Sequence, residues 1–178
     1  SVYATWSRGY KSGGFNGRPL NQDGLSFKPE RAESFEIGAK GKIFDGTMRL
    51  SGALFSTDFQ NLQISSLRGT SFVILNAASA RSQGFEASMR WLPPLTGATL
   101  DASVGLADAR YLHYANAPAL SDSSSTSQDL SGKPLSFAPR WTASLVPSYS
   151  RYVTPYDIGV TFAMDVLYRD QQYLDVDD

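Results

Sequence analysis

The sequence contains no cysteine among its 178 residues and a single histidine, His113. Disulfide bonds, thiolate zinc sites and cysteine nucleophiles are therefore excluded. One histidine cannot provide a metal site made of several imidazoles, and the chain shows no nucleophile–base pair. We therefore expect no enzyme activity, no catalytic residues, no metal site and no cofactor, and we interpret His113 first as a solvated side chain.

Long hydrophobic runs and an excess of basic residues are also absent. No segment approaches the ~18 consecutive apolar residues that a membrane helix needs, and the mean hydropathy is −0.25. This value does not exclude a membrane β-barrel, because barrel strands alternate apolar and polar residues. The formal net charge is −1, and no cluster of Lys and Arg forms a basic stripe, so we expect no nucleic-acid partner.

Alternation with a period of two dominates what is present. In residues 33–44, Phe35 and Ile37 share one side while Ser34 and Glu36 share the other, which is typical of a β-strand. The chain is also rich in glycine (15 residues) and aromatics (12%). The pattern predicts seven antiparallel strands, at residues 1–10, 33–44, 47–63, 79–92, 98–112, 138–152 and 158–169.

The predicted connections alternate between long and short. Asp45-Gly46 predicts a type I′ hairpin turn, because both central residues of that turn need positive φ. Short turns are also expected at residues 93–97 and 154–157, whereas 11–29, 65–70 and 113–136 read as loops. Outer-membrane barrels have short periplasmic turns and long extracellular loops. The sequence therefore predicts an all-β, antiparallel up-and-down transmembrane β-barrel that is only partial.

Charged residues of the second strand have a simple explanation in such a barrel. We assign Glu33, Glu36, Lys40 and Lys42 to the same side of the strand, facing a wet interior. A barrel lumen tolerates charge, while the lipid-facing side does not.

Four segments resemble TonB-dependent outer-membrane receptors, in the order of that family. They are YATWSRGYKSGGFN, FKPERAESFEIGAKGKIFDGTMRLSGALFSTDFQNLQ, NAASARSQGFEASMRW and DLSGKPLSFAPRWTASL. The resemblance implies a 22-stranded barrel in the outer membrane of a Gram-negative bacterium, closed by an N-terminal plug domain. It also implies import of scarce ligands, mostly ferric siderophores, with energy from the TonB complex.

Residues 1–178 are then expected to be a fragment of one barrel domain, about seven strands of the wall. Strand-like sequence at both ends suggests that the chain is cut at both. The plug domain and the segment that contacts TonB are not recognised in it. The expected partners are outer-membrane lipid, the receptor's own plug, the TonB complex, and a ferric siderophore or another small ligand.

Residues of the long loops are the candidates for ligand binding. Arginine and aromatic side chains could hold an anionic ferric siderophore through charge-assisted hydrogen bonds and stacking. Asp122 and Asp129 are too few and too far apart for a calcium site. The predicted ligand-binding residues are Phe15, Asn16, Arg18, Tyr111, His113 and Tyr114.

Two other interpretations stay open at this stage. A structural or adhesive outer-membrane barrel, such as an autotransporter-type translocator, would have the same strands and no transport role. A secreted β-sandwich that binds sugars would pack its apolar faces against each other.

Overall fold

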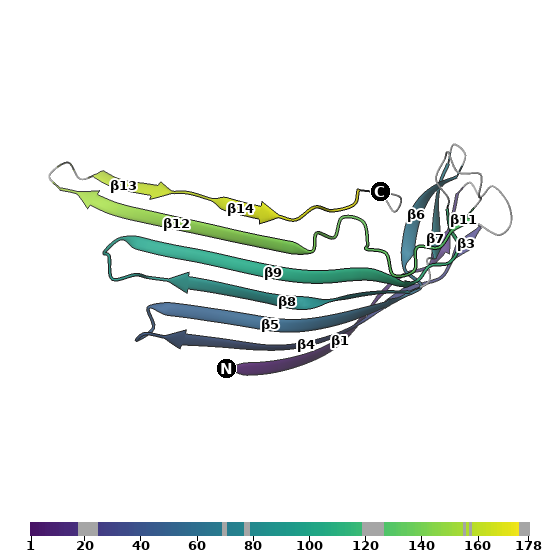
Figure 1. Cartoon of the computed structure of the whole chain (residues 1–178), viewed down its shortest axis with the longest axis horizontal. Coiled ribbons are helices and arrows are strands. Elements are labelled where there is room, and N and C mark those ends of the chain that lie inside the picture. Colours follow the sequence, from purple (N-terminus) through teal and green to yellow (C-terminus); the bar gives the residue numbers. More distant parts are fainter. Residues whose placement is uncertain are drawn as a thin grey trace.

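One large antiparallel sheet forms most of the molecule. The computed structural model describes residues 1–17, 25–68, 71–76, 79–118, 127–154, 156 and 158–174. The strands of the sheet follow one another as neighbours in the order β1-β4-β5-β8-β9-β12-β13, and β14 also pairs with β12 (Figure 1). Their bounds are Val2–Lys11 (β1), Glu30–Ile43 (β4), Met48–Gln60 (β5), Ser79–Trp91 (β8), Ala98–His113 (β9), Trp141–Val153 (β12), Ile158–Ala163 (β13) and Val166–Arg169 (β14).

The two ends of the sheet differ in their connections. Short turns join the strands at one end, and three pairs of smaller strands gather at the other (Figure 1). The predicted alternation of short and long connections is therefore present in the structure. The smaller pairs are β2 (Gly14–Phe15) with β3 (Ser26–Phe27), β6 (Gln63–Arg68) with β7 (Ser71–Asn76), and β10 (Ala117–Pro118) with β11 (Ser127–Gln128).

Two details differ from the strands predicted by alternation. Residues 65–68 of the expected loop belong to β6, which pairs with β7. The strand expected at 158–169 is interrupted between β13 and β14, although both keep one register on β12. The interruption lies opposite Val146 and Pro147, and a proline has no N–H to donate to a ladder. The backbone bond from Met164 N to Pro147 O, 3.1 Å, still crosses this position.

The turn after β4 has the geometry that its sequence predicts. Asp45 and Gly46 have φ values of 53° and 86°, and Thr47 N donates to Phe44 O at 3.0 Å. Positive φ at both central residues is what a type I′ turn requires. Phe44 also has a positive φ of 51°, so the chain reverses through three successive residues of left-handed backbone.

The sheet has one apolar and one polar face, because residues paired across strands point the same way. On the apolar face, one row across the sheet pairs Ile37 with Leu54, Leu54 with Phe85, Phe85 with Leu106 and Leu106 with Trp141. The pairing also assigns Leu50 and Leu54 of β5 to this face, a question that the sequence pattern leaves undecided. A row on the polar face consists of Lys40, Ser51, Ser88, Ser103 and Ser144.

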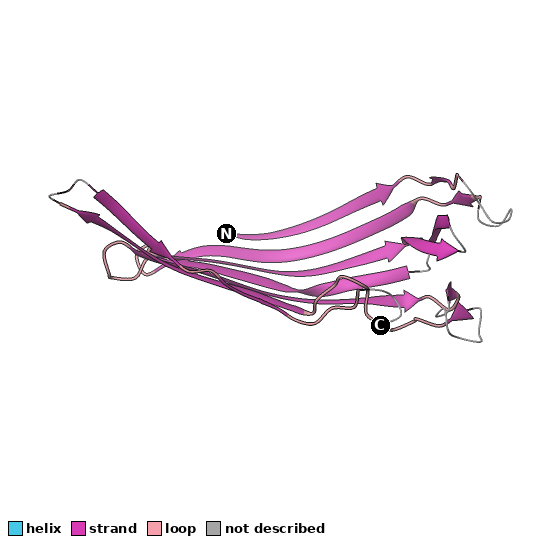
Figure 2. Ribbon diagram, turned by 90° about the horizontal axis from the view of Figure 1, so that it is seen from above, coloured by secondary structure: helices cyan, strands magenta, loops and turns pink. Residues whose placement is uncertain are grey.

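The apolar face is uncovered. The sheet is a single curved layer, with no second sheet against it among the described residues (Figure 2). Phe35, Ile37 and Leu54 are more than half exposed. An apolar area of this extent marks a surface for a membrane or a partner, and the single layer differs from a sandwich, in which two sheets enclose a core. In the described part of the chain, no helix is long and apolar enough to cross a membrane.

Candidate functional site

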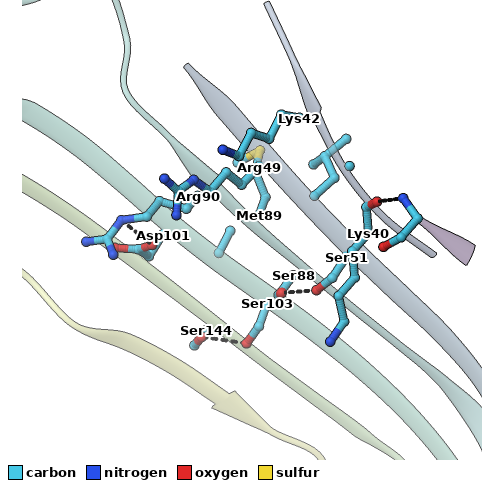
Figure 3. A pocket seen from close by; sticks show the side chains of 14 residues that line it. Lys40, Lys42, Arg49, Ser51, Ser88, Met89, Arg90, Asp101, Ser103 and Ser144 are labelled. Carbon is cyan, nitrogen blue, oxygen red and sulfur yellow. Dashed lines mark hydrogen bonds and ion pairs between the residues drawn. The ribbon is translucent and has the colours of Figure 1, made fainter. Parts of the chain in front are cut away.

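Four cationic side chains gather on the polar face near the short-turn end. Pairing between β4, β5 and β8 places Lys42, Arg49 and Arg90 in one row, and Lys40 lies two residues away on β4. Asp101 of β9 continues the row, with its Oδ1 3.4 Å from Arg90 Nε. These five residues, which we call the basic cluster, contain one carboxylate against four cations. They line a hollow of about 680 Å³ (Figure 3).

A row of serine hydroxyls lies beside the basic cluster. Ser51 Oγ and Ser88 Oγ are 2.7 Å apart, as are Ser103 Oγ and Ser144 Oγ, so the hydroxyls hydrogen-bond in pairs across four strands (Figure 3). Each hydroxyl has one proton to donate and two lone pairs to accept with. The polar face can therefore exchange hydrogen bonds with water or a polar solute along this row.

Negative charge occupies the middle of the polar face. Glu36 of β4 and Glu86 of β8 line a hollow of about 420 Å³, together with Tyr3 and Thr142. The ring of Tyr3 covers Gly38, where a Cβ atom would collide with it. On the polar face, the acidic side chains therefore lie in the middle of the sheet, and the basic cluster lies nearer its short-turn end.

A small apolar cluster closes the loop end of the polar face. Tyr111 and Tyr114 are buried there with Ala80, Ala117 and Leu130, and the two rings lie 5.1 Å apart between centroids. Ala80 and Tyr111 come from the sheet, whereas the other three belong to the connection after β9. That connection therefore folds back over the polar face, with Leu130 N donating to Tyr114 O at 3.0 Å.

The structure brings Tyr111 and Tyr114 together but buries both, with exposed fractions of 4% and 7%. Asn16 is 9% exposed and links its loop to β7. Its side chain donates to Ile74 O at 2.9 Å and accepts from Ile74 N at 2.8 Å. The Asn16 side chain therefore holds its loop against β7.

The remaining predicted ligand-binding residues are accessible or lie outside the described part. Phe15 is 78% exposed, and His113 is exposed at the end of β9. Arg18 falls outside the described residues. Ligand binding by the six residues stays a prediction.

One assignment made from the sequence is wrong. Glu33 was expected beside Glu36, Lys40 and Lys42, but it lies on the opposite face of β4. Its Oε1 accepts from Trp6 Nε1 at 2.8 Å and from the Arg8 guanidinium at 3.2 Å. Positions 33 and 36 are an odd number of residues apart, so a regular strand must point them in opposite directions.

Asp129 and Ser131 form a local hydrogen-bonded pair in the connection after β9, which we call the Asp129 clasp. The Ser131 hydroxyl and backbone N–H both hydrogen-bond the Asp129 carboxylate and hold the pKa of Asp129 below its usual value. The Ser131 Oγ in turn accepts from Tyr114 N at 2.9 Å. Among the described residues, no group of three His, Cys, Asp or Glu side chains is placed to hold a metal ion.

The basic cluster was not recognisable as a unit from sequence alone. Lys40 and Lys42 carry a signal because they alternate within one strand. Arg49, Arg90 and Asp101 join them only through the register of three hairpins. Counting outward from the short turns would have found the pairs Lys42–Arg49 and Arg90–Asp101, since residues at equal distance from a turn face each other. The two pairs meet only because β5 pairs with β8 across a long connection.

Comparison with protein families gives a match along the whole chain. Residues 1–178 match the family described as TonB dependent receptor-like, beta-barrel. A stretch of 73 residues, 41% of the chain, is 32% identical to a protein of Acinetobacter baumannii named "Probable TonB-dependent siderophore receptor PiuA", of which it covers 9%.

Solved structures of outer-membrane receptors have the same fold. The ferric yersiniabactin uptake receptor FyuA from Yersinia pestis aligns with a TM-score of 0.73 and 20% identity, over 99% of this chain and 24% of that one. The siderophore receptor PiuA from Acinetobacter baumannii aligns with a TM-score of 0.69 and 23% identity, over 98% and 24%. The chain therefore spans 24% of the length of each of these structures.

Proposed function

The chain belongs to the TonB-dependent receptors, β-barrel proteins of the Gram-negative outer membrane, and we propose that it forms part of a receptor that imports a ferric siderophore. The sheet corresponds to part of the barrel wall. Receptors of this family are transporters rather than enzymes. The apolar face then meets lipid and the polar face lines the lumen.

The short-turn end is periplasmic in this arrangement, and the loop end is extracellular. The basic cluster then lies on the periplasmic side of the lumen, with Glu36 and Glu86 at mid-height. Phe15, in the connection after β1, and His113, at the end of β9, are on the side where a ligand arrives. Contact of these loop residues with the ligand is part of the proposal.

The excess positive charge of the basic cluster is the observation that carries the choice of ligand. Ferric siderophores built on catecholate or carboxylate groups are anionic, and cations on a lumen wall attract such a solute and donate charge-assisted hydrogen bonds to it. Lys42, Arg49 and Arg90 lie in one row, and among the described residues that line the hollow Asp101 is the one carboxylate. Relatives named as siderophore receptors support the same choice.

Energy and closure come from parts of the receptor beyond this chain. A plug domain inside the barrel would prevent free diffusion, and the TonB complex would deliver the energy that displaces it. The polar face, with its charges and serine hydroxyls, suits a water-lined contact with such a plug.

Uptake measurements test the proposal. Iron-starved cells that carry or lack the full-length gene, each with and without functional TonB, are given labelled ferric siderophores. We expect uptake only in cells that have both the gene and TonB. Uptake that does not change when the gene is deleted would contradict import of those siderophores.

A further inference from the structure

The β2–β3 connection and the β6–β7 hairpin lie against each other at the loop end of the sheet, where β3 contacts β7 (Figure 1). We call them the rim hairpins. Their described residues are 12–17 and 25–29 in the first, and 61–68 and 71–76 in the second. Lys28 of the first and Asn76 of the second are 48 residues apart in the chain. Tertiary contacts must therefore hold the two together.

The first link between the rim hairpins is the side chain of Asn16. Its Nδ2 donates to Ile74 O at 2.9 Å, and its Oδ1 accepts from Ile74 N at 2.8 Å. Among the described residues, β7 pairs with β6 alone, so its second edge is open to this contact. The buried amide of Asn16 thus takes the place of a neighbouring strand, because it bonds backbone groups that an edge strand leaves unpaired.

The second link has the same geometry in the opposite direction. Asn76 of β7 accepts from Lys28 N at 2.7 Å and donates to Lys28 O at 3.0 Å. The Nδ2 of Asn76 also donates to Asn61 O at 2.9 Å, at the start of its own hairpin. Each rim hairpin therefore contributes one asparagine side chain and one backbone position to the contact.

A third side chain joins the bases of the rim hairpins. Gln63, the first residue of β6, donates from Nε2 to Ser12 O at 2.9 Å and to Lys28 O at 3.1 Å. Its backbone N–H donates to Glu30 Oε2 at 2.8 Å, where β4 begins. The carbonyl oxygen of Lys28 accepts from both Gln63 and Asn76, which is possible because it has two lone pairs. The second and third links therefore share an atom.

This arrangement makes separation of the rim hairpins cooperative. If Asn16 alone releases Ile74, the bonds of Asn76 and Gln63 still hold the hairpins at the same distance. The freed backbone groups then lose their partners while the chain gains little freedom. The links are therefore expected to break together, in one local opening of the whole unit.

We infer that the rim hairpins are one rigid body, which moves as a unit at the extracellular mouth with Asn16 and Asn76 as its couplers. A contact made by either hairpin is then transmitted to the other, because neither can move alone. Asn16 and Asn76 are positioning residues in this role, since their side-chain amides bond the backbone of the opposite hairpin. This inference is independent of the transported ligand, because it concerns the receptor without any solute.

Hydrogen exchange of the full-length receptor in lipid bilayers, resolved to single amides, tests it. The reporters are the amides of Ile74 and Lys28, which donate to different asparagines. Asn16→Ala removes the acceptor of Ile74 alone, and Asn76→Ala removes that of Lys28 alone. We expect each substitution to speed exchange at both amides about tenfold, because the opening is shared.

Asn116→Ala is the matched control, since Asn116 is an exposed asparagine in the connection after β9. It should leave both exchange rates unchanged. The amide of Thr47, at a short turn, should keep its rate in all three variants. Faster exchange only at the amide whose own acceptor is removed would overturn the inference, because the hairpins would then open separately. Faster exchange at Thr47 as well would also contradict it, because the loosening would be general.

Distances between spin labels give a second measurement. Ser26 and Ser65 are exposed positions on the two rim hairpins, and each can be changed to cysteine and labelled in an otherwise cysteine-free full-length receptor. We expect a narrow distance distribution with both asparagines present and a broader one in the double variant Asn16→Ala/Asn76→Ala. A distribution that is equally broad in both receptors would contradict a rigid body.

Discussion

Alternate residues of the same strands make the two faces of the sheet, yet one face is apolar and the other is lined by hydroxyls and charges. Ile37 and Leu54 are neighbours on the first, Lys40 and Ser51 on the second. The difference shows that the odd or even position of a residue along its strand determines whether its side chain belongs to the apolar or the polar face. Position along the strand also matters. Glu33 has the parity of the apolar face, yet a charged residue is tolerated there because the position lies beyond the apolar band, which on β4 runs from Phe35 to Ile43.

Placing a charge in the apolar band should give the largest effect. In the full-length receptor, Leu54→Arg should lower the free energy of unfolding by about 2–4 kcal/mol, because lipid cannot solvate the guanidinium. Ala53→Arg, one residue away on the polar face, should cost less than about 1 kcal/mol. Urea unfolding in lipid vesicles measures the free energy of unfolding of both variants. Equal losses of stability would contradict the assignment of different environments to the two faces.

Added bulk should give the opposite pattern: it should destabilise the protein on the polar face and have little effect on the apolar face. Gly38→Val would displace the Tyr3 ring from the polar face, at a cost of about 1–3 kcal/mol. Gly41→Val points into open space on the apolar face and should leave stability nearly unchanged. The same unfolding measurement compares them. A harmless Gly38→Val would mean that Tyr3 does not pack there.

Neutralising the basic cluster should affect transport more than stability. The triple variant Lys42→Gln/Arg49→Gln/Arg90→Gln should reduce uptake of labelled ferric siderophore about tenfold, through loss of attraction for the anion. Arg151→Gln removes a cation from the lipid-facing side and should leave uptake unchanged. If the triple variant transports at the wild-type rate, the cluster has no part in passage of the ligand.

The smallest effect is expected at the Asp129 clasp. Hydrogen bonds from Ser131 lower the pKa of Asp129, so the carboxylate stabilises the folded connection above its unfolded pKa. That contribution is lost as the pH falls through the lower, folded pKa. Asp129→Asn should therefore speed amide exchange at Tyr114 about twofold at neutral pH, as followed by mass spectrometry, whereas Asp165→Asn should not. An unchanged rate would show that the clasp is not what holds the connection.

The membrane-spanning strands were predictable because lipid enforces strict alternation. β4, β8 and β9 lie within three residues of their expected bounds. The β6–β7 hairpin was missed, since strands beyond the bilayer need no apolar side and leave a weaker pattern. The break between β13 and β14 depends on Pro147 of the neighbouring strand, which a reading of one segment at a time does not include.

Site residues were harder to predict than strands. Phe15 and His113 are accessible, as loop positions suggest. Tyr111 and Tyr114 are buried because the connection after β9 folds over the polar face, a tertiary contact without a local signature. Arg49 and Arg90 become neighbours only through strand register.

Water and lipid access along β4 tests the central claim, that the chain is a barrel wall with alternating lipid and lumen sides. Because the chain has no cysteine, single cysteines can be introduced at positions 33 to 40 of an otherwise cysteine-free full-length receptor. We predict that positions 34, 36 and 40 react with a water-soluble thiol reagent, while 35, 37 and 39 are shielded and quenched by a lipid-borne probe; position 38 is left out because the Tyr3 ring covers it. Position 33 should react despite its odd parity. Uniform reactivity, or the inverse alternation, would contradict the assignment of the two faces.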